Sequence, residues 1–182
     1  PVLVLQLAWA FETGGEITCR PLLLPVDGHA DVLVFGSYDG HLYVLEQRHG
    51  SVLAQASIGG SLFASPIALP PPSSSSSSLV LCTNRGLLSR WLLTAPSSPS
   101  ASWSLSTTWT HDLRSPTFST PCLCPSSSLL VLGCTDGSIR AVRASDGKPV
   151  WRRDTPQPVF SSPTPTSLPS ITDGGGDDVA FI

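Results

Sequence analysis

Short apolar runs separated by polar turns recur along the whole chain. Residues 32–45 and 129–142 share one pattern, in which two apolar runs flank a turn that ends in Asp-Gly; a degraded copy occupies 79–88. Asp-Gly between apolar runs is a strong signal for a β-hairpin, because a type I′ turn needs positive φ at both central residues. The pattern therefore predicts hairpins with two-residue turns at Asp39-Gly40 and Asp136-Gly137.

Further glycines lie at fixed distances from these turns. Gly36 and Gly133 each end the first apolar run, and Gly50 and Gly147 each come ten residues after the glycine of Asp-Gly. Glycine inside a strand pattern marks a bulge or a close backbone approach, and glycine after a strand marks another turn. Each copy is therefore expected to hold two hairpins, which together make four short strands.

Four prolines set the period of a repeat. Three of them end the related phrases Phe-Ala-Ser-Pro, Phe-Ser-Thr-Pro and Phe-Ser-Ser-Pro, and each proline is expected to open the first strand of a unit. The prolines are Pro21, Pro66, Pro121 and Pro163, and the residues 12 positions before them are Trp9, Ala54, Trp109 and Trp151. A tryptophan at three of four positions, without a gap, makes the repeat specific.

Four strands in roughly 40–55 residues is the size of one β-propeller blade. The fold class expected is all-β, a β-propeller fragment of four-stranded antiparallel blades. The serine run 73–78 and the stretch 94–106 are interpreted as insertions in connections. The expected boundaries are the end of a blade at 4–10, three blades at 17–57, 61–110 and 116–154, and the start of another at 158–182.

Composition narrows the class of protein. Serine, proline and glycine occupy 62 of 182 positions and charged residues only 13%, which argues against a helical bundle, while 41% hydrophobic residues argue against disorder. The net charge is −3 without a basic block, so no nucleic-acid partner is expected. No apolar run approaches the ~20 residues that span a bilayer, so no membrane partner is expected either.

The chain ends suggest a larger polypeptide. It begins at Pro1, contains no methionine, and stops within the apolar run Val179–Ile182. We therefore expect a fragment whose partners include the remaining blades of the same propeller.

The repeat resembles the pyrroloquinoline-quinone (PQQ) type of propeller repeat. The resemblance rests on Gly-Ser-x-Asp-Gly-x-Leu-Tyr, on x-Gly-x-x-x-Trp and on Phe-Ser-Ser-Pro, and it covers nearly the whole chain. It implies that Trp9, Trp109 and Trp151 dock against neighbouring blades, whereas Ala54 departs from the pattern. The Trp-Asp signature of WD40 repeats is missing.

Quinone chemistry is not expected in this segment. The resemblance implies that a quinone site of PQQ-dependent dehydrogenases would need a calcium ion, a catalytic aspartate and a pair of adjacent cysteines. This chain has no adjacent cysteines, and its single asparagine is Asn84. Asp39 and Asp136 are explained by turn geometry. No catalytic, cofactor-binding or metal-binding residue is therefore assigned, since the fold alone does not imply function.

Three other motifs are interpreted as structural. Gly59-Gly60-Ser61-Leu62 is similar to the phosphopantetheine attachment phrase of carrier proteins, but it lacks one residue and no helical pattern follows. Gly174-Gly175-Gly176 precedes two aspartates that would repel a phosphate, so a loop is expected. His41 follows a turn and is expected to be solvated rather than catalytic.

The five cysteines, at 19, 82, 122, 124 and 134, are an odd number scattered through strand-like segments. They are interpreted as small buried side chains in a reducing compartment, which favours a cytoplasmic location. Cys122 and Cys124 share one face of a strand, but a metal site would need further ligands.

The leading functional hypothesis is a non-catalytic scaffold or interaction segment. The repeated sequence phrases of this chain most resemble those in the C-terminal propellers of acid-activating enzymes in the acyl-CoA synthetase family. The resemblance implies an ATP-using adenylation domain and a phosphopantetheine carrier domain elsewhere in the parent, which would be an ATP-dependent ligase. Two alternatives stay open: a fragment of a PQQ-dependent quinoprotein oxidoreductase, and a propeller that scaffolds an assembly.

Overall fold

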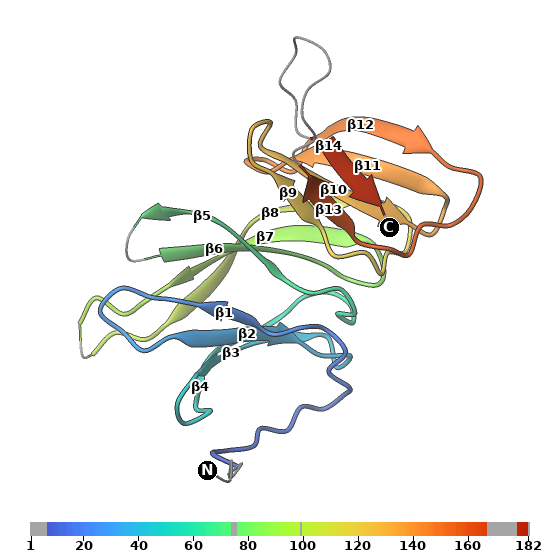
Figure 1. The fold of residues 1–182 in the computed structure, drawn as a ribbon. Helices are drawn as coiled ribbons and strands as arrows, with labels where there is room; N and C mark the ends of the chain where they lie inside the picture. Colours follow the sequence, from blue (N-terminus) through green and yellow to red (C-terminus); the bar gives the residue numbers. More distant parts are fainter. Residues whose placement is uncertain (1–6, 74–75, 99, 167–177, 182) are drawn as a thin grey trace, which may run out of the picture.

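A computed structural model describes residues 7–73, 76–98, 100–166 and 178–181. The described residues form strands, turns and connections without a helix, which confirms the all-β prediction. Three four-stranded antiparallel sheets follow one another along the chain, each with its strands in sequence order. Figure 1 shows the sheets in succession from the blue blade through the green blade to the orange blade.

Each sheet is one propeller blade whose first strand is innermost. Blade 1 contains β1 (Leu22–Leu24), β2 (Val32–Gly36), β3 (His41–Glu46) and β4 (Val52–Ser57). Blade 2 contains β5 (Ile67–Ser73), β6 (Ser76–Cys82), β7 (Leu87–Thr94) and β8 (Ser104–Asp112). Blade 3 contains β9 (Cys122–Cys124), β10 (Leu129–Cys134), β11 (Ser138–Arg143) and β12 (Pro149–Asp154).

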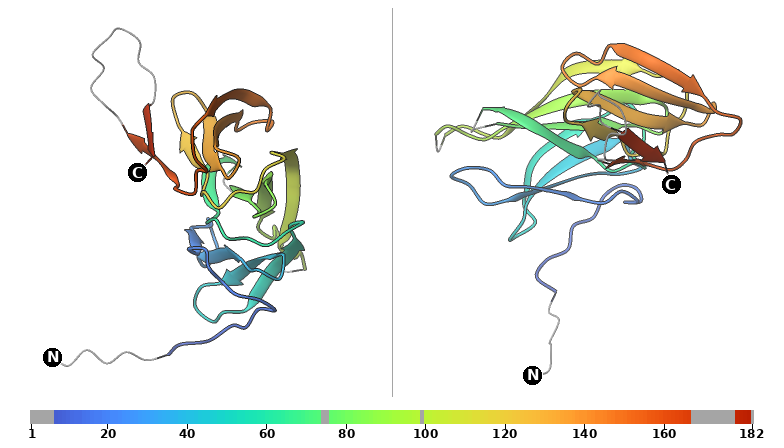
Figure 2. Two further views of the ribbon diagram at one scale, coloured as in Figure 1. Left: turned by 90° about the vertical axis from the view of Figure 1, so that its right-hand side faces the viewer. Right: turned by 45° about the horizontal axis from the view of Figure 1, so that its top comes forward.

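A two-stranded sheet follows blade 3. It consists of β13 (Pro163–Thr166) and β14 (Asp178–Phe181), which pair antiparallel. Figure 2 shows the blades fanning out as an arc around an open side, with this small sheet beside blade 3.

The core lies between blades because both faces of the middle strands are apolar. In β6, Leu79 and Leu81 pack in the cluster shared with blade 1, whereas Val80 and Cys82 pack in the cluster shared with blade 3. All four are fully buried. A strand covered on both faces reads as a continuous apolar run, as residues 79–82 do.

The hairpin turns differ from the type I′ prediction. Gly40 and Gly137 have φ of +83° and +75°, but Asp39 and Asp136 are not among the positive-φ residues. The N–H of Gly40 donates to Ser37 O over 3.2 Å, and Ser37 pairs with His41, so the loop holds three residues. This is a type I turn followed by a left-handed glycine, the usual three-residue hairpin loop.

The two insertions are also more regular than predicted. Ser73 pairs with Ser76, and Ser76–Ser78 continue β6, so the serine run lengthens a hairpin. Thr94 pairs with Ser104, which extends the β7–β8 hairpin in the same way. Ser78 is almost fully buried and accepts a hydrogen bond from Arg90, so its hydroxyl has the partner that burial requires.

The N-terminal segment was expected to finish a blade at 4–10. Residues 7–10 form no strand, and residues 1–6 lie outside the described part of the chain. Further along the chain, Tyr38 N–H of blade 1 donates to Glu16 O over 2.9 Å.

Candidate functional site: the blade junctions and the axial groove

The docking implied for the tryptophans is visible at two junctions. Trp9 donates from Nε1 to Gln47 O over 2.9 Å, and Trp109 donates from Nε1 to Ala144 O over 3.1 Å. Both acceptors belong to the turn between the third and fourth strands of the following blade. The indoles of Trp9 and Trp109 therefore lie over the blade that follows each of them in the sequence.

Gly50 and Gly147 make this approach possible. A Cβ on Gly50 would lie 2.5 Å from Cε3 of Trp9, and a Cβ on Gly147 would lie 2.5 Å from Cε3 of Trp109. Both glycines also have positive φ, +70° and +71°. Any side chain here would be strained and would clash with the indole.

The other two positions of the tryptophan series differ. Trp151 is 37% exposed on the face of blade 3 that points away from blade 2. Ala54 packs partly buried against the cluster between blades 1 and 2. The structure thus places two of the three tryptophans in the same contact.

Asp39 and Asp136 have equivalent roles in their turns. Asp39 accepts from His41 N–H over 3.0 Å and from the Tyr43 hydroxyl over 2.7 Å, and Asp136 accepts from Ser138 N–H over 3.1 Å and pairs with Arg140. Each carboxylate therefore holds the strand that follows its turn, which is a structural role.

Hydrogen bonding also sets the ionisation of these groups. Burial would raise the pKa of Asp39, but the bonds from Tyr43, His41 N–H and Gly14 N–H outweigh it and lower the pKa. Burial, together with the bond to Asp39, raises the pKa of Tyr43 to about 12. Both shifts stabilise the pair as carboxylate and phenol near neutrality.

The Ser-Pro phrases form a ladder between blades. The residue before each of the first three prolines donates its N–H to the hydroxyl of the equivalent residue before the next proline. These bonds run from Arg20 to Ser65 over 2.9 Å, from Ser65 to Thr120 over 3.0 Å, and from Thr120 to Ser162 over 2.9 Å. The prolines Pro21, Pro66, Pro121 and Pro163 then lead into or begin β1, β5, β9 and β13.

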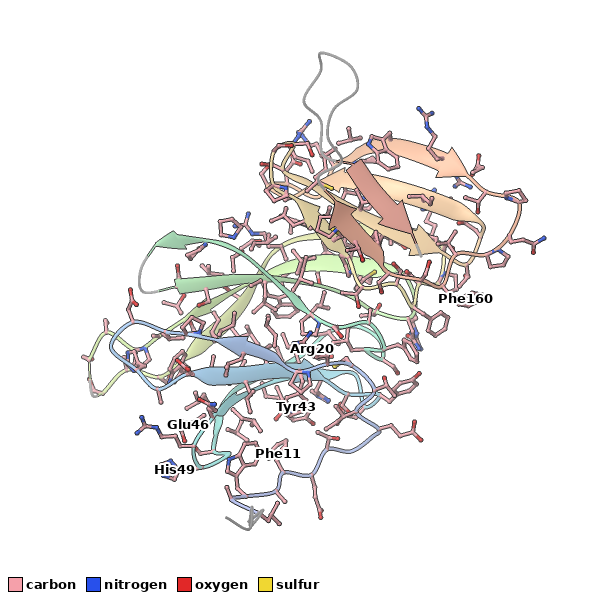
Figure 3. The ribbon with its side chains drawn as sticks, in the orientation of Figure 1. Phe11, Arg20, Tyr43, Glu46, His49 and Phe160 are labelled. Carbon is pink, nitrogen blue, oxygen red and sulfur yellow. The ribbon has the colours of Figure 1, made fainter. Side chains whose placement is uncertain are left out.

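The phenylalanines of the same phrases form a second row. The ring centroids of Phe63 and Phe118 lie 5.1 Å apart, and those of Phe118 and Phe160 lie 5.9 Å apart. Phe63 is 39% exposed and Phe160 59% exposed. Figure 3 labels Phe160 on the connection that enters β13. The row is an apolar strip on one face of the arc, which the sequence reading had not predicted.

Residues two before the prolines tie the phrases to their own blades. Cys19 Sγ lies 3.4 Å from both the N and the O of Gly36, and Ser119 Oγ accepts from Gly133 N–H over 3.2 Å. A Cβ on Gly36 would overlap Leu62, and one on Gly133 would overlap Val159. These two glycines therefore leave room for the phrase of the next blade.

A groove of about 580 Å³ lies along the inner strands. The ladder hydroxyls of Ser65, Thr120 and Ser162 line it, together with Arg20 and apolar side chains of β1 and β5. Arg20 is exposed, and Figure 3 labels it at the start of β1. The groove is therefore lined by hydroxyl-bearing residues, one cationic residue and apolar residues.

Two of the three motifs interpreted as structural lie within the described residues. Ser61 donates to Tyr38 O over 2.8 Å, and Leu62 is fully buried. His41 is 40% exposed, with Nδ1 at 3.4 Å from Asp39. Gly174-Gly175-Gly176 lie outside the described residues.

The cysteines are buried at all five positions. Burial raises the pKa of the thiols of Cys19, Cys82 and Cys134. A raised pKa disfavours the reactive thiolate. Within the described ranges, no three His, Cys, Asp or Glu side chains gather as a metal site would require.

The radial blades define the chain as a β-propeller segment. It matches BamB from Moraxella catarrhalis with a TM-score of 0.59 and 22% identity over 86% of this chain and 46% of that one. It also matches the Cps50 (Swd1) β-propeller domain from Myceliophteria thermophila, with a TM-score of 0.59 and 11% identity over 81% and 43%. These similarities establish the fold alone.

One sequence relative gives a more particular match. The chain is 32% identical over 151 residues to the beta-alanine-activating enzyme of Drosophila melanogaster, covering 82% of this chain and 14% of that enzyme. The chain thus corresponds to a small part of this relative and to about half of the propellers above. No family model matches the sequence. No helix among the described residues has the length and apolarity of a membrane crossing.

Proposed function

We propose that this chain is a non-catalytic propeller segment with PQQ-type repeats, serving as a scaffold or interaction domain in an acid-activating enzyme. The observation that carries the proposal is the match to the beta-alanine-activating enzyme, which extends over most of this chain and a small part of that enzyme. A segment of this size is an accessory part of a larger polypeptide, whose substrate would be β-alanine or a related acid.

The geometry supports a role in binding and assembly. Asp39, Asp136 and the ladder hydroxyls, the polar groups that recur with the repeat, take part in turns and blade junctions. The exposed features that remain are the phenylalanine row and the axial groove. Packing of indoles on glycine turns supports the PQQ-type assignment.

The remaining parts of the proposal concern the larger enzyme of which this segment would be a part. In that enzyme the segment would contact the other blades of the propeller, an adenylation domain that uses ATP, and a carrier domain with a phosphopantetheine arm. The segment itself holds no cofactor in this proposal. Buried cysteines with raised thiol pKa values fit a cytoplasmic location, because they need no oxidising environment.

The test compares the full-length parent with the double variant Phe63→Ser/Phe160→Ser, which alters the exposed row and leaves the buried junctions intact. ATP–pyrophosphate exchange with β-alanine reports acid activation, and labelled β-alanine on the carrier reports loading. We expect exchange to persist and loading to fall. Unchanged loading would contradict an interaction role for this face, and absence of exchange in the wild-type parent would contradict the acid-activating assignment. Oxidation that depends on added PQQ and Ca²⁺ would favour the quinoprotein alternative.

A further inference from the structure

Arg90 lies at a position where the other blades have small apolar residues. It comes four residues after the turn glycine Gly86, as Val44 follows Gly40 and Ala141 follows Gly137. Val44 and Ala141 are fully buried. The strand alternation that directs Leu88 to the cluster shared with blade 3 directs Arg90 to the same side. An arginine therefore replaces an apolar side chain between two blades.

Burying the charge of Arg90 at this position costs free energy, and contacts within the blade do not offset that cost. Arg90 Nε donates to Ser78 Oγ over 2.8 Å, and no described residue accepts from its Nη atoms or forms an ion pair with it. A half-buried charge without a counter-ion is unfavourable. Local breaks of the repeat rule of this kind concentrate at functional sites.

Arg90 lines a pocket of about 230 Å³ between blades 2 and 3. The other lining residues are Ser128 and Ser145, together with the apolar residues Leu69, Pro70, Leu123, Pro125 and Ala144. Trp109 is the cross-strand neighbour of Arg90 and binds Ala144 O, so the junction holds this wall in place. The pocket thus combines one cation with a short apolar space.

We propose that this pocket binds a small aliphatic monocarboxylate, with its carboxylate on the Nη edge of Arg90 and its chain against the apolar walls. Guanidinium pairs with carboxylate through two parallel N–H···O bonds. A phosphate dianion would require more donors than this pocket supplies, since Arg90 is the only cation among the lining residues. The site is separate from the axial groove and does not depend on the proposed parent enzyme.

The test measures binding of butanoate to the full-length protein by calorimetry, with butanamide and inorganic phosphate as further probes. Butanoate is expected to bind, and neither butanamide nor phosphate is expected to compete. Arg90→Gln should weaken butanoate binding about tenfold or more, as loss of a charged hydrogen-bonded pair does. Arg48→Gln, on an exposed turn, is the matched control and should bind normally.

Two further variants separate a binding role from a structural one. Arg90→Val restores the apolar residue found in blade 1 and should abolish binding while keeping or raising the melting temperature. Ser145→Phe, in the pocket lining, should weaken binding by filling the pocket while leaving Arg90 in place. Normal binding by both Arg90 variants, a lowered melting temperature of Arg90→Val, or competition by phosphate would each overturn the proposal.

Discussion

The junction between blades 2 and 3 and the junction between blades 1 and 2 bury aromatic side chains in opposite ways. At the first, Trp109 of blade 2 reaches forward onto the turn at Gly147 of blade 3. At the second, the corresponding residue of blade 1 is Ala54, which cannot reach across.

Blade 2 supplies the missing volume from its own side. Trp91 on β7 is 6% exposed and belongs to the cluster shared with blade 1, where Trp103 also packs. The Trp103 ring lies 5.3 Å from His29, before β2 of blade 1. Trp103 lies in the connection between β7 and β8, which is longer than the equivalent connection in blades 1 and 3. There, a short turn with a glycine joins the third and fourth strands. The space between two blades must be filled by large side chains, and either of the two blades can supply them.

Trp91→Ala should have the largest effect on stability. The change removes a buried indole from the junction that has no outer-strand tryptophan, and such truncations cost about 3–5 kcal/mol. Urea unfolding followed by circular dichroism measures the loss. Trp151→Ala, at an exposed indole, is the control and should cost much less. Equal costs for the two variants would show that Trp91 does not fill the junction.

Gly147→Ala should be next, at about 2–4 kcal/mol, because it combines positive φ with overlap of the Trp109 ring. Gly28→Ala isolates the backbone part, since Gly28 has φ of +75° and no atom within 4 Å of its Cβ position. Combining Gly147→Ala with Trp109→Ala should reduce the cost of the glycine change to that of Gly28→Ala. Strict additivity of the two changes would contradict the stacked arrangement.

Ala54→Trp tests whether the two ways of filling a junction exclude each other. The indole that the repeat would place here competes with the side chains already packed beside Ala54, so we expect destabilisation of about 1–3 kcal/mol. The same change combined with Trp103→Ala should be better tolerated. An increase in stability from Ala54→Trp alone would mean that the junction has space for both.

The smallest expected effect on stability is the pH dependence that comes from Tyr43, which lies where the N-terminal segment contacts blade 1. Phe11 packs edge-on against Tyr43 at 5.4 Å, and Figure 3 labels both near the start of the chain. Because the folded pKa of Tyr43 is raised to about 12, its contribution to stability is present below pH 10 and declines as the pH rises towards 12.

Absorbance titration of the phenolate in a Tyr38→Phe background isolates Tyr43. The pKa should be near 12, and Asp39→Asn should lower it, because the carboxylate that disfavours phenolate is gone. A Tyr43 pKa near 10 in the folded protein with Asp39 intact would contradict the buried hydrogen bond.

The sequence predicted what depends on local pattern. Alternating apolar runs, turn glycines and the 12-residue step from tryptophan to proline were sufficient for strand order and fold class, because each reflects contacts inside one blade or with its neighbour. The turn type was mistaken, since Asp-Gly also fits a three-residue loop in which only the glycine has positive φ.

The features that were missed depend on contacts between blades. The hydroxyl ladder and the phenylalanine row join residues 42 to 55 positions apart, and only their spacing before each proline could have indicated that they meet. Arg90 was overlooked because a single charge in a strand is unremarkable until the blades are superposed in register. The serine run lacks apolar alternation, so its pairing with β7 could not be read from its composition.

The hydrogen bonds of the ladder at the inner edge all run in one direction along the chain, and each has the same kind of donor and acceptor. Every link joins a backbone N–H to a hydroxyl one blade further along, from Arg20 to Ser65 and onward to Ser162. A gene duplication that inserts a copy of blade 2 or blade 3, whose phrases carry Ser65 and Thr120, therefore reproduces the same donor and acceptor at both new borders. Blade number can change during evolution without any compensating substitution along the axis, which makes this inner edge a natural site for lengthening or shortening the propeller.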